Sequence, residues 1–311
     1  MTDLHFTQIS DVHTSVLGDQ FDMLSGRSAG FLADIVFELN RIDDLDFVLF
    51  SGDLLVTGQQ QEFDQFLEAV LPLEKPYYVI PGNHDYAPAD SDEGLTRQEF
   101  MRYVNPQFED RPSAPGSQPG YWSLTVKPGI QLIGLDSNCD EDWGGIITAP
   151  QMAWLKNELA AHADKLIVLT VHHPLHALAP IDHYPEWSNF VLKNGPELLA
   201  LLDSQPQVKV VLTGHHHLTK ADTLGQRIHL ACPSIAIYPC AYRTLRLGQQ
   251  SNDQWWVEWQ THQATDEANL AEAQTRMFEG WAEVGFERDF VEAYVRQAWG
   301  RAEDRSGRVV L

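Results

Sequence analysis

Five short segments of the sequence carry side chains that could bind metal ions. Their Asp, Asn and His residues, with no cysteine among them, suit hard or borderline divalent ions such as manganese, iron or zinc. The segments are Asp11-Val12-His13, Gly52-Asp53, Gly82-Asn83-His84-Asp85, His172-His173-Pro174 and Gly214-His215-His216-His217. The potential donors are too many for one tetrahedral ion and fit two ions that share a bridging ligand: Asp11, His13, Asp53, Asn83, His172, His215 and His217.

Two divalent ions in such a site would favour hydrolysis of a phosphate ester. The ions bring four positive charges, and the carboxylates of Asp11 and Asp53 cancel two of them. The remaining charge can hold a phosphate group and lower the pKa of bound water to about 7, as in known zinc sites. The donor set therefore predicts a hydrolase that cleaves P–O bonds by attack of a metal-bound hydroxide.

Each segment alone is weak evidence for a metal site. A single His or Asp at the end of a strand is more often a hydrogen-bonded structural residue, and short patterns such as DxH, GD and HHP also occur by chance. The GNHD and GHxH patterns are more specific, and all five patterns in one order favour function. For His173, His216 and Asp85 the alternatives stay open, because each could contact the site or only shape its turn.

Predicted strands place the five segments at one edge of a sheet. Short, continuous apolar runs indicate strands buried on both faces: Leu4–Ile9, Phe47–Phe50, Tyr77–Ile80, Ile130–Leu135, Leu166–Val171 and Val208–Leu212. Amphipathic spacing predicts helices between them: Ala29–Ile42, Glu62–Leu71, Pro150–Ala163 and Pro196–Leu202. The alternation indicates α/β architecture. All but one of the strands end just before a segment, and loops at the carboxyl ends of such strands converge on one crevice.

The last third of the chain is predicted to contain strands and then helices. Expected strands lie at Arg227–Ala231, Ser234–Tyr238, Arg243–Leu247 and Trp255–Trp259, and Tyr121–Val126 should form a hairpin with the strand that follows it. Residues 267–301 are predicted to be helical, with an aromatic stripe expected to pack on the catalytic domain or on a second subunit. We therefore predict a catalytic domain of residues 1–262 and a helical C-terminal extension of residues 263–311. Residues 86–120 and 174–195 are expected to be long surface excursions.

The ordered patterns resemble those of the calcineurin-like metallophosphoesterases, namely DxH, GD, GNH[DE], a later His and GHxH. The resemblance covers roughly residues 4–217, and the spacing is similar to that of the bacterial group that includes class III cyclic nucleotide phosphodiesterases and glycerophosphodiesterases. It implies a four-layer sandwich of two mixed β-sheets flanked by helices, with the metals at one edge.

The resemblance also implies a role for each donor. Asp11, His13 and His217 would bind the first metal, and Asn83, His172 and His215 the second. Asp53 would bridge the ions, while His84 would contact the phosphate or protonate the leaving group. The expected activity is hydrolysis of a phosphodiester of the cyclic nucleotide or glycerophosphodiester type. A phosphomonoesterase is the near alternative, and a silent metal-binding scaffold is disfavoured because every donor is present.

Composition limits the partners and the location of the protein. The chain has 21 basic and 44 acidic residues, a formal net charge of -23, which disfavours a nucleic-acid polymer and leaves a small phosphate ester as the expected substrate. No apolar run reaches the roughly 18 residues of a membrane span. Three widely spaced cysteines and the absence of a secretory pattern at the start predict a cytoplasmic protein. No organic cofactor is expected, and the extension could support a homo-oligomer.

Overall fold

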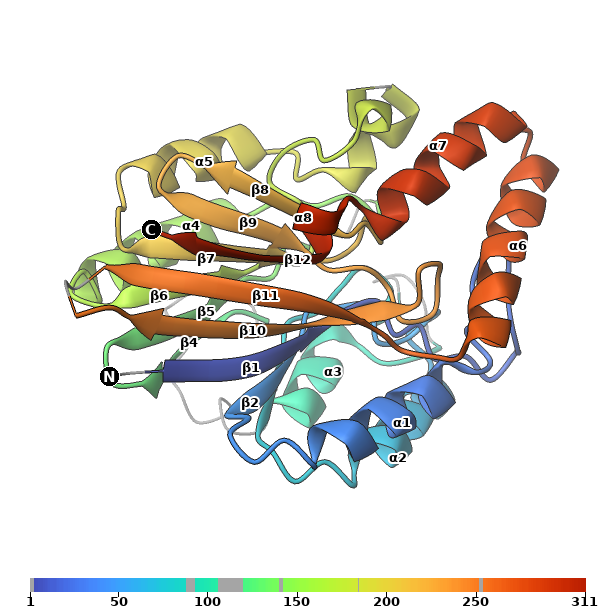
Figure 1. Cartoon of the computed structure of the whole chain (residues 1–311), viewed down its shortest axis with the longest axis horizontal. Helices are drawn as coiled ribbons and strands as arrows, with labels where there is room; N and C mark the ends of the chain where they lie inside the picture. The colour runs from blue at the N-terminus through green and yellow to red at the C-terminus, as the bar shows by residue number, and fades with distance from the viewer. Residues whose placement is uncertain (1–2, 88–92, 106–119, 140–141, 184, 252–253) are drawn as a thin grey trace.

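The structure is a computed structural model that describes residues 3–87, 93–105, 120–139, 142–183, 185–251 and 254–311. Within these ranges the strands form two six-stranded mixed sheets (Figure 1). The first sheet has the order β12-β11-β10-β1-β2-β3, with β1 (Asp3–Ile9), β2 (Phe47–Phe50), β3 (Tyr77–Val79), β10 (Ala241–Gln249), β11 (Trp255–Gln263) and β12 (Ser306–Val310). The second has the order β4-β5-β6-β7-β9-β8, with β4 (Trp122–Lys127), β5 (Ile130–Gly134), β6 (Leu166–Thr170), β7 (Val208–Thr213), β8 (Lys220–Leu224) and β9 (Arg227–Ala231).

Helices cover the outer faces of both sheets. α1 (Ser28–Leu39), α2 (Gln60–Val70) and α3 (Arg97–Val104) pack on the first sheet, while α4 (Ala149–Ala161) and α5 (Gly195–Asp203) pack on the second (Figure 1). One core cluster joins the two sheets, since Phe6 of β1 and Leu212 of β7 belong to it. Strands buried on both faces explain the continuous apolar runs of the sequence. The expected four-layer sandwich is confirmed.

The parallel strands carry the site-forming segments. β1, β2 and β3 are parallel neighbours in the first sheet, and β6 and β7 are parallel neighbours in the second. Because neighbouring parallel strands end at the same edge, the loops after these five strands lie at one edge of the sandwich. In contrast, β10 pairs antiparallel with β1 and with β11, so the chain after residue 240 extends the first sheet without adding a further motif.

One predicted strand is wrong and two strands were not predicted. Residues Ser234–Tyr238 form only isolated bridges, because the Ser234 hydroxyl donates to the carbonyl of Asp11 and accepts from the amides of Ala236 and Ile237. This is a side-chain-stabilised turn beside the first motif. The unpredicted strands β8 and β12 lie at sheet edges, where polar residues are common and the apolar pattern is weak.

The two excursions differ in how much of them the structure describes. Residues 174–195 contain two short 3-10 helices, Pro180–His183 and Pro185–Phe190. In residues 86–120, α3 begins at a capping box formed by Thr96 and Glu99. The rest of that excursion lies largely outside the described residues.

The C-terminal extension is helical, as expected, and then returns to the sheet. It contains α6 (Glu267–Glu283), α7 (Arg288–Trp299) and α8 (Ala302–Arg305), followed by β12, which pairs with β11 (Figure 1). Met277, Tyr294 and Val295 are buried in a cluster with side chains of the catalytic domain, and Trp281 stacks on Trp187 at 5.0 Å between ring centroids. The aromatic stripe thus packs on its own chain. The division at residue 262 stays a prediction.

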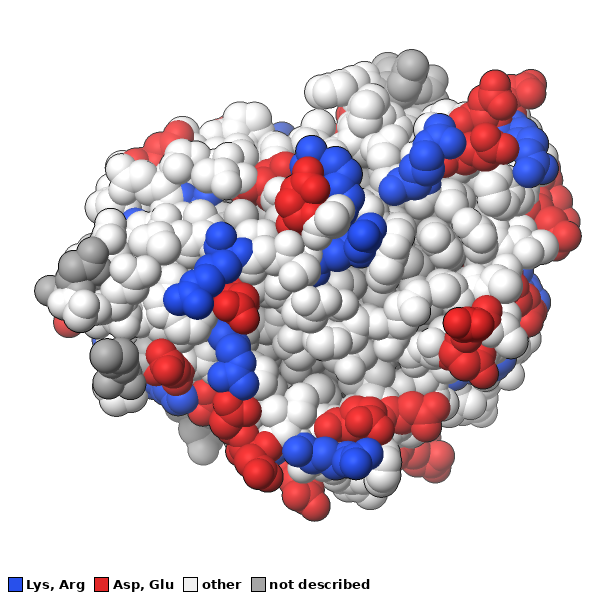
Figure 2. All heavy atoms as spheres, in the orientation of Figure 1, with Lys and Arg blue, Asp and Glu red and all other residues white. Residues whose placement is uncertain are grey.

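Surface charge and helix composition are relevant to the two partners that the sequence disfavours, a nucleic-acid polymer and a membrane. On the face that Figure 2 shows, acidic and basic side chains are interspersed, and this view contains no continuous basic stripe. Among the described residues, no helix is both long enough and apolar enough to cross a membrane.

Burial of α6 predicts that the extension folds together with the sandwich. Met277 of α6 is fully buried, so Met277→Ala should lower the free energy of unfolding by about 2–5 kcal/mol in urea denaturation. Val284, at the end of the same helix, is 59% exposed, and Val284→Ala should change stability by less than about 0.5 kcal/mol. An unchanged main transition in Met277→Ala would mean that the extension unfolds separately.

Candidate metal centre

Six of the seven expected donors meet in two adjacent groups at the edge of the sandwich. Asp11, His13 and His217 form one group, and Asp53, His172 and His215 form the other, with the potential ligand atoms of each group within 4.8 Å of one another. Residues more than 200 positions apart in the sequence are thereby brought together. Each group contains only carboxylate oxygens and imidazole nitrogens, as the sequence predicted.

The backbone at the donors adopts a conformation that side chains rarely tolerate. Seven non-glycine residues in the described part of the chain have positive φ angles, and five of them are expected donors: Asp11, His13, Asp53, His215 and His217. Positive φ in residues other than glycine costs free energy and persists only where the surroundings hold it, often at functional sites. The turns after β1, β2 and β7 are therefore shaped to aim these side chains.

The carboxylates of Asp53 and Asp11 each face histidines of both groups. Its Oδ2 lies 3.2 Å from Nε2 of His172, in its own group, and 3.8 Å from Nε2 of His13, in the other. Asp11 Oδ1 in turn lies 3.2 Å from Nε2 of His217 and 4.0 Å from Nε2 of His172. A carboxylate oxygen that faces nitrogens of both groups can ligate two ions at once.

Backbone carbonyls fix which ring nitrogen each histidine presents. Nδ1 of His13 donates to the carbonyl of Leu55 at 3.2 Å, and Nδ1 of His172 donates to Ser51 at 2.8 Å. When each ring is neutral, these bonds leave the lone pair on Nε2, which is then the nitrogen that can bind a metal ion. His215 is held the other way round, because its Nε2 donates to the carbonyl of Asn189 and leaves Nδ1 available. Such bonds orient histidine ligands in metal sites.

Two glycines of the motifs allow the turns to approach each other closely. A Cβ atom on Gly82 would lie 2.1 Å from Oδ1 of Asp53, and one on Gly52 would lie 2.5 Å from Nδ1 of His172. Gly52 also has a φ of +98°. Both positions therefore exclude any side chain.

Asp85 joins two of the motif turns. Its carboxylate accepts backbone N–H groups of Gly82 at 2.7 Å, Asp53 at 2.9 Å and Leu54 at 2.6 Å. Burial and the neighbouring charge of Asp53 raise the pKa of Asp85, while these N–H donors oppose the rise. Of the two alternatives left open for this residue, the structure supports the one in which it shapes the turn.

A backbone hydrogen bond to Asp53 holds the turn that contains Asn83 and His84 beside the site. The backbone N–H of His84 donates to Oδ1 of Asp53 at 2.9 Å, which places the preceding Asn83 beside the same carboxylate. The His84 ring is half-buried, lies 5.1 Å from the His13 ring, and donates from Nδ1 to the carbonyl of Val56. Nε2 of His84 is therefore the ring nitrogen that this hydrogen bond leaves available.

Burial and mutual charge set the protonation of the cluster. Burial lowers the pKa of His13 to about 3 and holds that of His215 well below its usual value, so both rings are neutral. Burial opposes ionisation of Asp53, but its interactions with the neighbouring histidines, His172 first among them, together outweigh burial and hold the Asp53 pKa well below its usual value. Burial likewise disfavours a charged His172, yet Asp53 and Asp11 raise its pKa to about 9.

The donor set fits two metal ions. Oδ1 of Asn83 is buried and has no hydrogen-bond partner among the described residues. Buried polar atoms are nearly always paired, so this oxygen needs a partner of another kind. A metal ion would provide it, since Asn83 belongs to the expected donor set and the ionised carboxylates would offset part of the metal charge.

Three residues around the donors were not singled out as site residues from the sequence, namely Asp182, Tyr294 and Trp143. His216 binds the Asp182 carboxylate from the second excursion, and Tyr294 of α7 donates to the carbonyl of His216. Nε2 of His173 donates to the carbonyl of Trp143, whose indole lies 5.8 Å from the His215 ring. A Trp followed by two glycines, as at 143–145, was the one local hint of a shaped loop.

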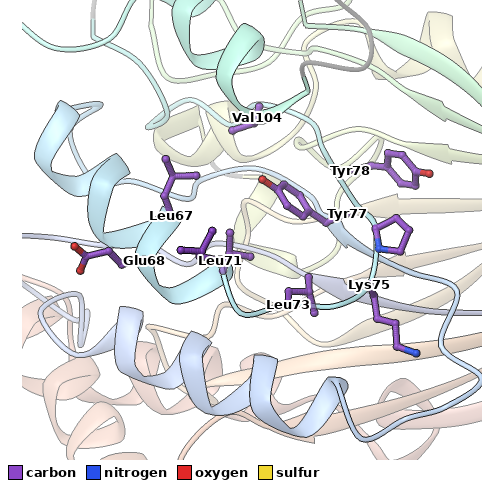
Figure 3. Close-up of a pocket in the computed structure, with 10 residues that line it drawn as sticks. Leu67, Glu68, Leu71, Leu73, Lys75, Tyr77, Tyr78 and Val104 are labelled. Carbon is purple, nitrogen blue, oxygen red and sulfur yellow. The ribbon is translucent and has the colours of Figure 1, made fainter.

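An apolar pocket of about 730 Å³ beside β3 lies away from this centre. Leu67, Leu73, Tyr77 and Val104 are among its lining residues (Figure 3), and none of the expected donors lines it. Tyr77 opens β3, whereas the motif follows the other end of that strand. The pocket offers no group for the expected chemistry.

Comparisons with known proteins agree with this geometry. A family model described as calcineurin-like phosphoesterase matches residues 4–218. A probable glycerophosphodiester phosphodiesterase of Arcobacter nitrofigilis is 31% identical over 73% of this chain and 77% of its own. A 3′,5′-cyclic-nucleotide phosphodiesterase of Nostoc is 28% identical over 69% and 71%. A dimetal phosphatase from Danio rerio shares the fold with a TM-score of 0.63, at 16% identity over 85% of this chain and 97% of that one.

The protonation pattern predicts that metal binding releases protons. A ligand must be deprotonated to bind metal, and the pKa of His172 near 9 means that it carries a proton at pH 7 in the metal-free protein. Binding of Mn²⁺ at pH 7 should release at least about one proton per chain, and affinity should rise with pH up to about 9. Calorimetric titration in two buffers of different ionisation enthalpy measures the release.

The variant His162→Gln is a control for this titration, because His162 lies at the end of α4, outside the centre. It should release as many protons as the unmodified chain. A binding heat that does not depend on the buffer would contradict the predicted state of His172.

Proposed function

The chain belongs to the calcineurin-like phosphoesterase family, and from this premise we propose a dinuclear metal-dependent phosphodiesterase with a small substrate. The observation that carries the proposal is the position of Asp53, whose carboxylate faces histidines of both donor groups. Such an arrangement suits two ions held close together, as in enzymes that hydrolyse phosphate esters.

We propose the following ligands for the two ions. Asp11, His13 and His217 would hold one ion, Asn83, His172 and His215 would hold the other, and Asp53 would be the ligand that the two ions share. Oxygen and imidazole donors suit manganese, iron or zinc. When bound, the ions supply the positive charge that holds a phosphate ester and acidifies the attacking water.

The protein's own groups orient the reaction. The imidazoles of His13, His172 and His215 donate hydrogen bonds to the backbone carbonyls of Leu55, Ser51 and Asn189. These bonds fix the tautomer and the orientation of each ring, so the ligands need little rearrangement when the ions bind. His84 is held in the same way by the carbonyl of Val56. A protonated His84 donates from Nε2 to a phosphoryl oxygen or to the departing oxygen, which makes it the proposed general acid or phosphate contact.

Trp143 favours a substrate with a planar group. Its indole is 42% exposed, lies beside His215 and packs edge-on against Phe190 at 5.0 Å. The bond from His173 to its backbone carbonyl fixes the loop, and Lys193 forms an ion pair with the adjacent Asp142. An exposed, fixed indole beside a metal ligand provides a stacking surface. Between the two kinds of diester, it favours the cyclic nucleotide, whose base can stack.

Two other functions remain less favoured on specific grounds. A phosphomonoesterase would use the same centre and differs only in substrate. A silent scaffold would not need His84, yet His84 is held beside the donors with Nε2 left for a substrate.

Two further properties belong to this proposal. A cytoplasmic location agrees with the buried thiols of Cys232 and Cys240, which form no disulfide. Self-association would involve the outer surface of the extension.

Substrate profiling tests the proposed function. The manganese-loaded chain should hydrolyse a 3′,5′-cyclic nucleotide and a glycerophosphodiester faster than a phosphomonoester. Trp143→Ala should lower kcat/KM for the cyclic nucleotide by about 5- to 150-fold, the range expected for one lost stacking contact, and should affect the glycerophosphodiester far less.

Trp256→Ala is the matched control for this measurement. Trp256 lies on β11 under the guanidinium of Arg308 and outside the centre. Both substrates should be hydrolysed at the unmodified rate by this variant. A chain that prefers the monoester would refute the diesterase, whereas equal losses on both diesters in Trp143→Ala would refute only the stacking role.

His84→Ala separates proton donation from mere shaping of the turn. General acid catalysis contributes about 10²- to 10⁴-fold, so the variant should lose activity in this range on diesters with alkyl leaving groups. Both metals should stay bound, because His84 is not a proposed ligand. An aryl ester, whose leaving group needs no proton, should suffer less. Full activity with normal metal content would remove His84 from the mechanism.

A further inference from the structure

The turn that carries His215 and His217 is held by its middle residue. The imidazole of His216 is buried and donates from Nε2 to Oδ1 of Asp182. The other carboxylate oxygen of Asp182 accepts the backbone N–H groups of Leu178 at 2.7 Å and Ala179 at 3.0 Å. The side chain of His216 is thus anchored in the second excursion and not at the donors.

The backbone of His216 is held separately, by the C-terminal extension. The hydroxyl of Tyr294 in α7 donates to the carbonyl of His216 at 2.9 Å, and the two rings stack with an interplanar angle of 23°. Tyr294 is only 5% exposed. Within the described ranges, no second hydrogen bond reaches this carbonyl, so without the hydroxyl a buried acceptor would lose its partner.

This carbonyl lies in the most constrained part of the turn. His215 and His217 flank it with φ angles of 63° and 57°, both in the left-handed region. Residues in such conformations persist only where the surrounding structure fixes them. The two flanking residues also belong to different donor groups. A shift of the His216 peptide would therefore move one proposed ligand of each ion.

The extension is fixed firmly enough to act on this turn. The carbonyl of Ala298 in α7 accepts the N–H of Thr219, two residues after His217. Nε1 of Trp281 in α6 donates to Asp22 at 2.8 Å, and Glu272 of the same helix forms an ion pair with Arg27 at 2.6 Å. The helices are thus attached both to the turn after β7 and to the segment that follows the first motif.

We propose that Tyr294 is a positioning residue of the metal centre. Through the carbonyl of His216 it sets the positions of His215 and His217, so the extension completes the site whose ligands the five motifs supply. The inference rests on the proposed function, because it takes both histidines as metal ligands. The C-terminal extension would thus position two metal ligands, which neither the five motifs nor the two sheets do through this carbonyl.

The test is the variant Tyr294→Phe, which removes one oxygen atom and keeps the ring. Mn²⁺ affinity, measured by competition with a chelator, should weaken by about tenfold at both sites, as is typical when a group that supports metal ligands is lost. Activity should fall at limiting metal and recover at saturating metal. A role confined to packing would not produce this dependence on metal concentration.

Tyr242→Phe is the matched control. Tyr242 is buried to a similar degree, 9% exposed, and stacks on His262 in the first sheet. Its variant should bind Mn²⁺ as the unmodified chain does, and the melting temperatures of the metal-free variants check that both fold.

The outcomes separate the inference from the function on which it rests. Unchanged Mn²⁺ affinity in Tyr294→Phe, while the unmodified chain binds two ions, would overturn the inference alone. Weaker affinity at one site only would overturn the claim that Tyr294 sets both ligands. Failure of the unmodified chain to bind Mn²⁺ would overturn the proposed function and the inference together.

Discussion

The burial of two ionised carboxylates among histidines is the constraint on which the rest of the site depends. Asp11 and Asp53 are almost completely buried and lie within 4 Å of imidazole nitrogens. Burying a charge is costly unless it is paired and hydrogen-bonded. In the metal-free protein a protonated His172 provides part of the pairing, and two bound cations would provide more. The buried negative charges are therefore costly without a cation beside them, and for the same reason they favour the binding of metal ions.

Keeping these groups together requires support from many parts of the backbone. Carbonyls at Leu55, Ser51 and Asn189 orient the rings, Asp85 ties two turns together, and Gly82 permits the closest approach. These supporting groups come from the turns after β2 and β3 of the first sheet and from the second excursion. The extension adds Tyr294, whose hydroxyl fixes the turn after β7. The sandwich thus aims the ligands, and the segments around it hold them in place.

The sequence predicted the site residues that lie in short motifs, but it did not predict the contacts between residues far apart in the chain. The donors were predictable because each lies in a short pattern directly after an apolar strand, as at Asp11 after β1 and His172 after β6. Tyr294 and Asp182 could not be found, since their partner His216 is 78 and 34 residues away and nothing near them in sequence marks the contact. The segment Ser234–Tyr238 was predicted as a strand because its β-forming residues outweighed one serine, whose hydroxyl folds it into a turn.

The most direct test of the account is the anomalous scattering of crystals of the manganese-loaded protein. Two anomalous peaks per chain are expected, about 3.5–4 Å apart, with Asp53 Oδ2 in contact with both. One peak should adjoin Asp11, His13 and His217, and the other Asn83, His172 and His215. A single peak, or two peaks that do not share Asp53, would contradict the dinuclear centre from which the proposed function is argued.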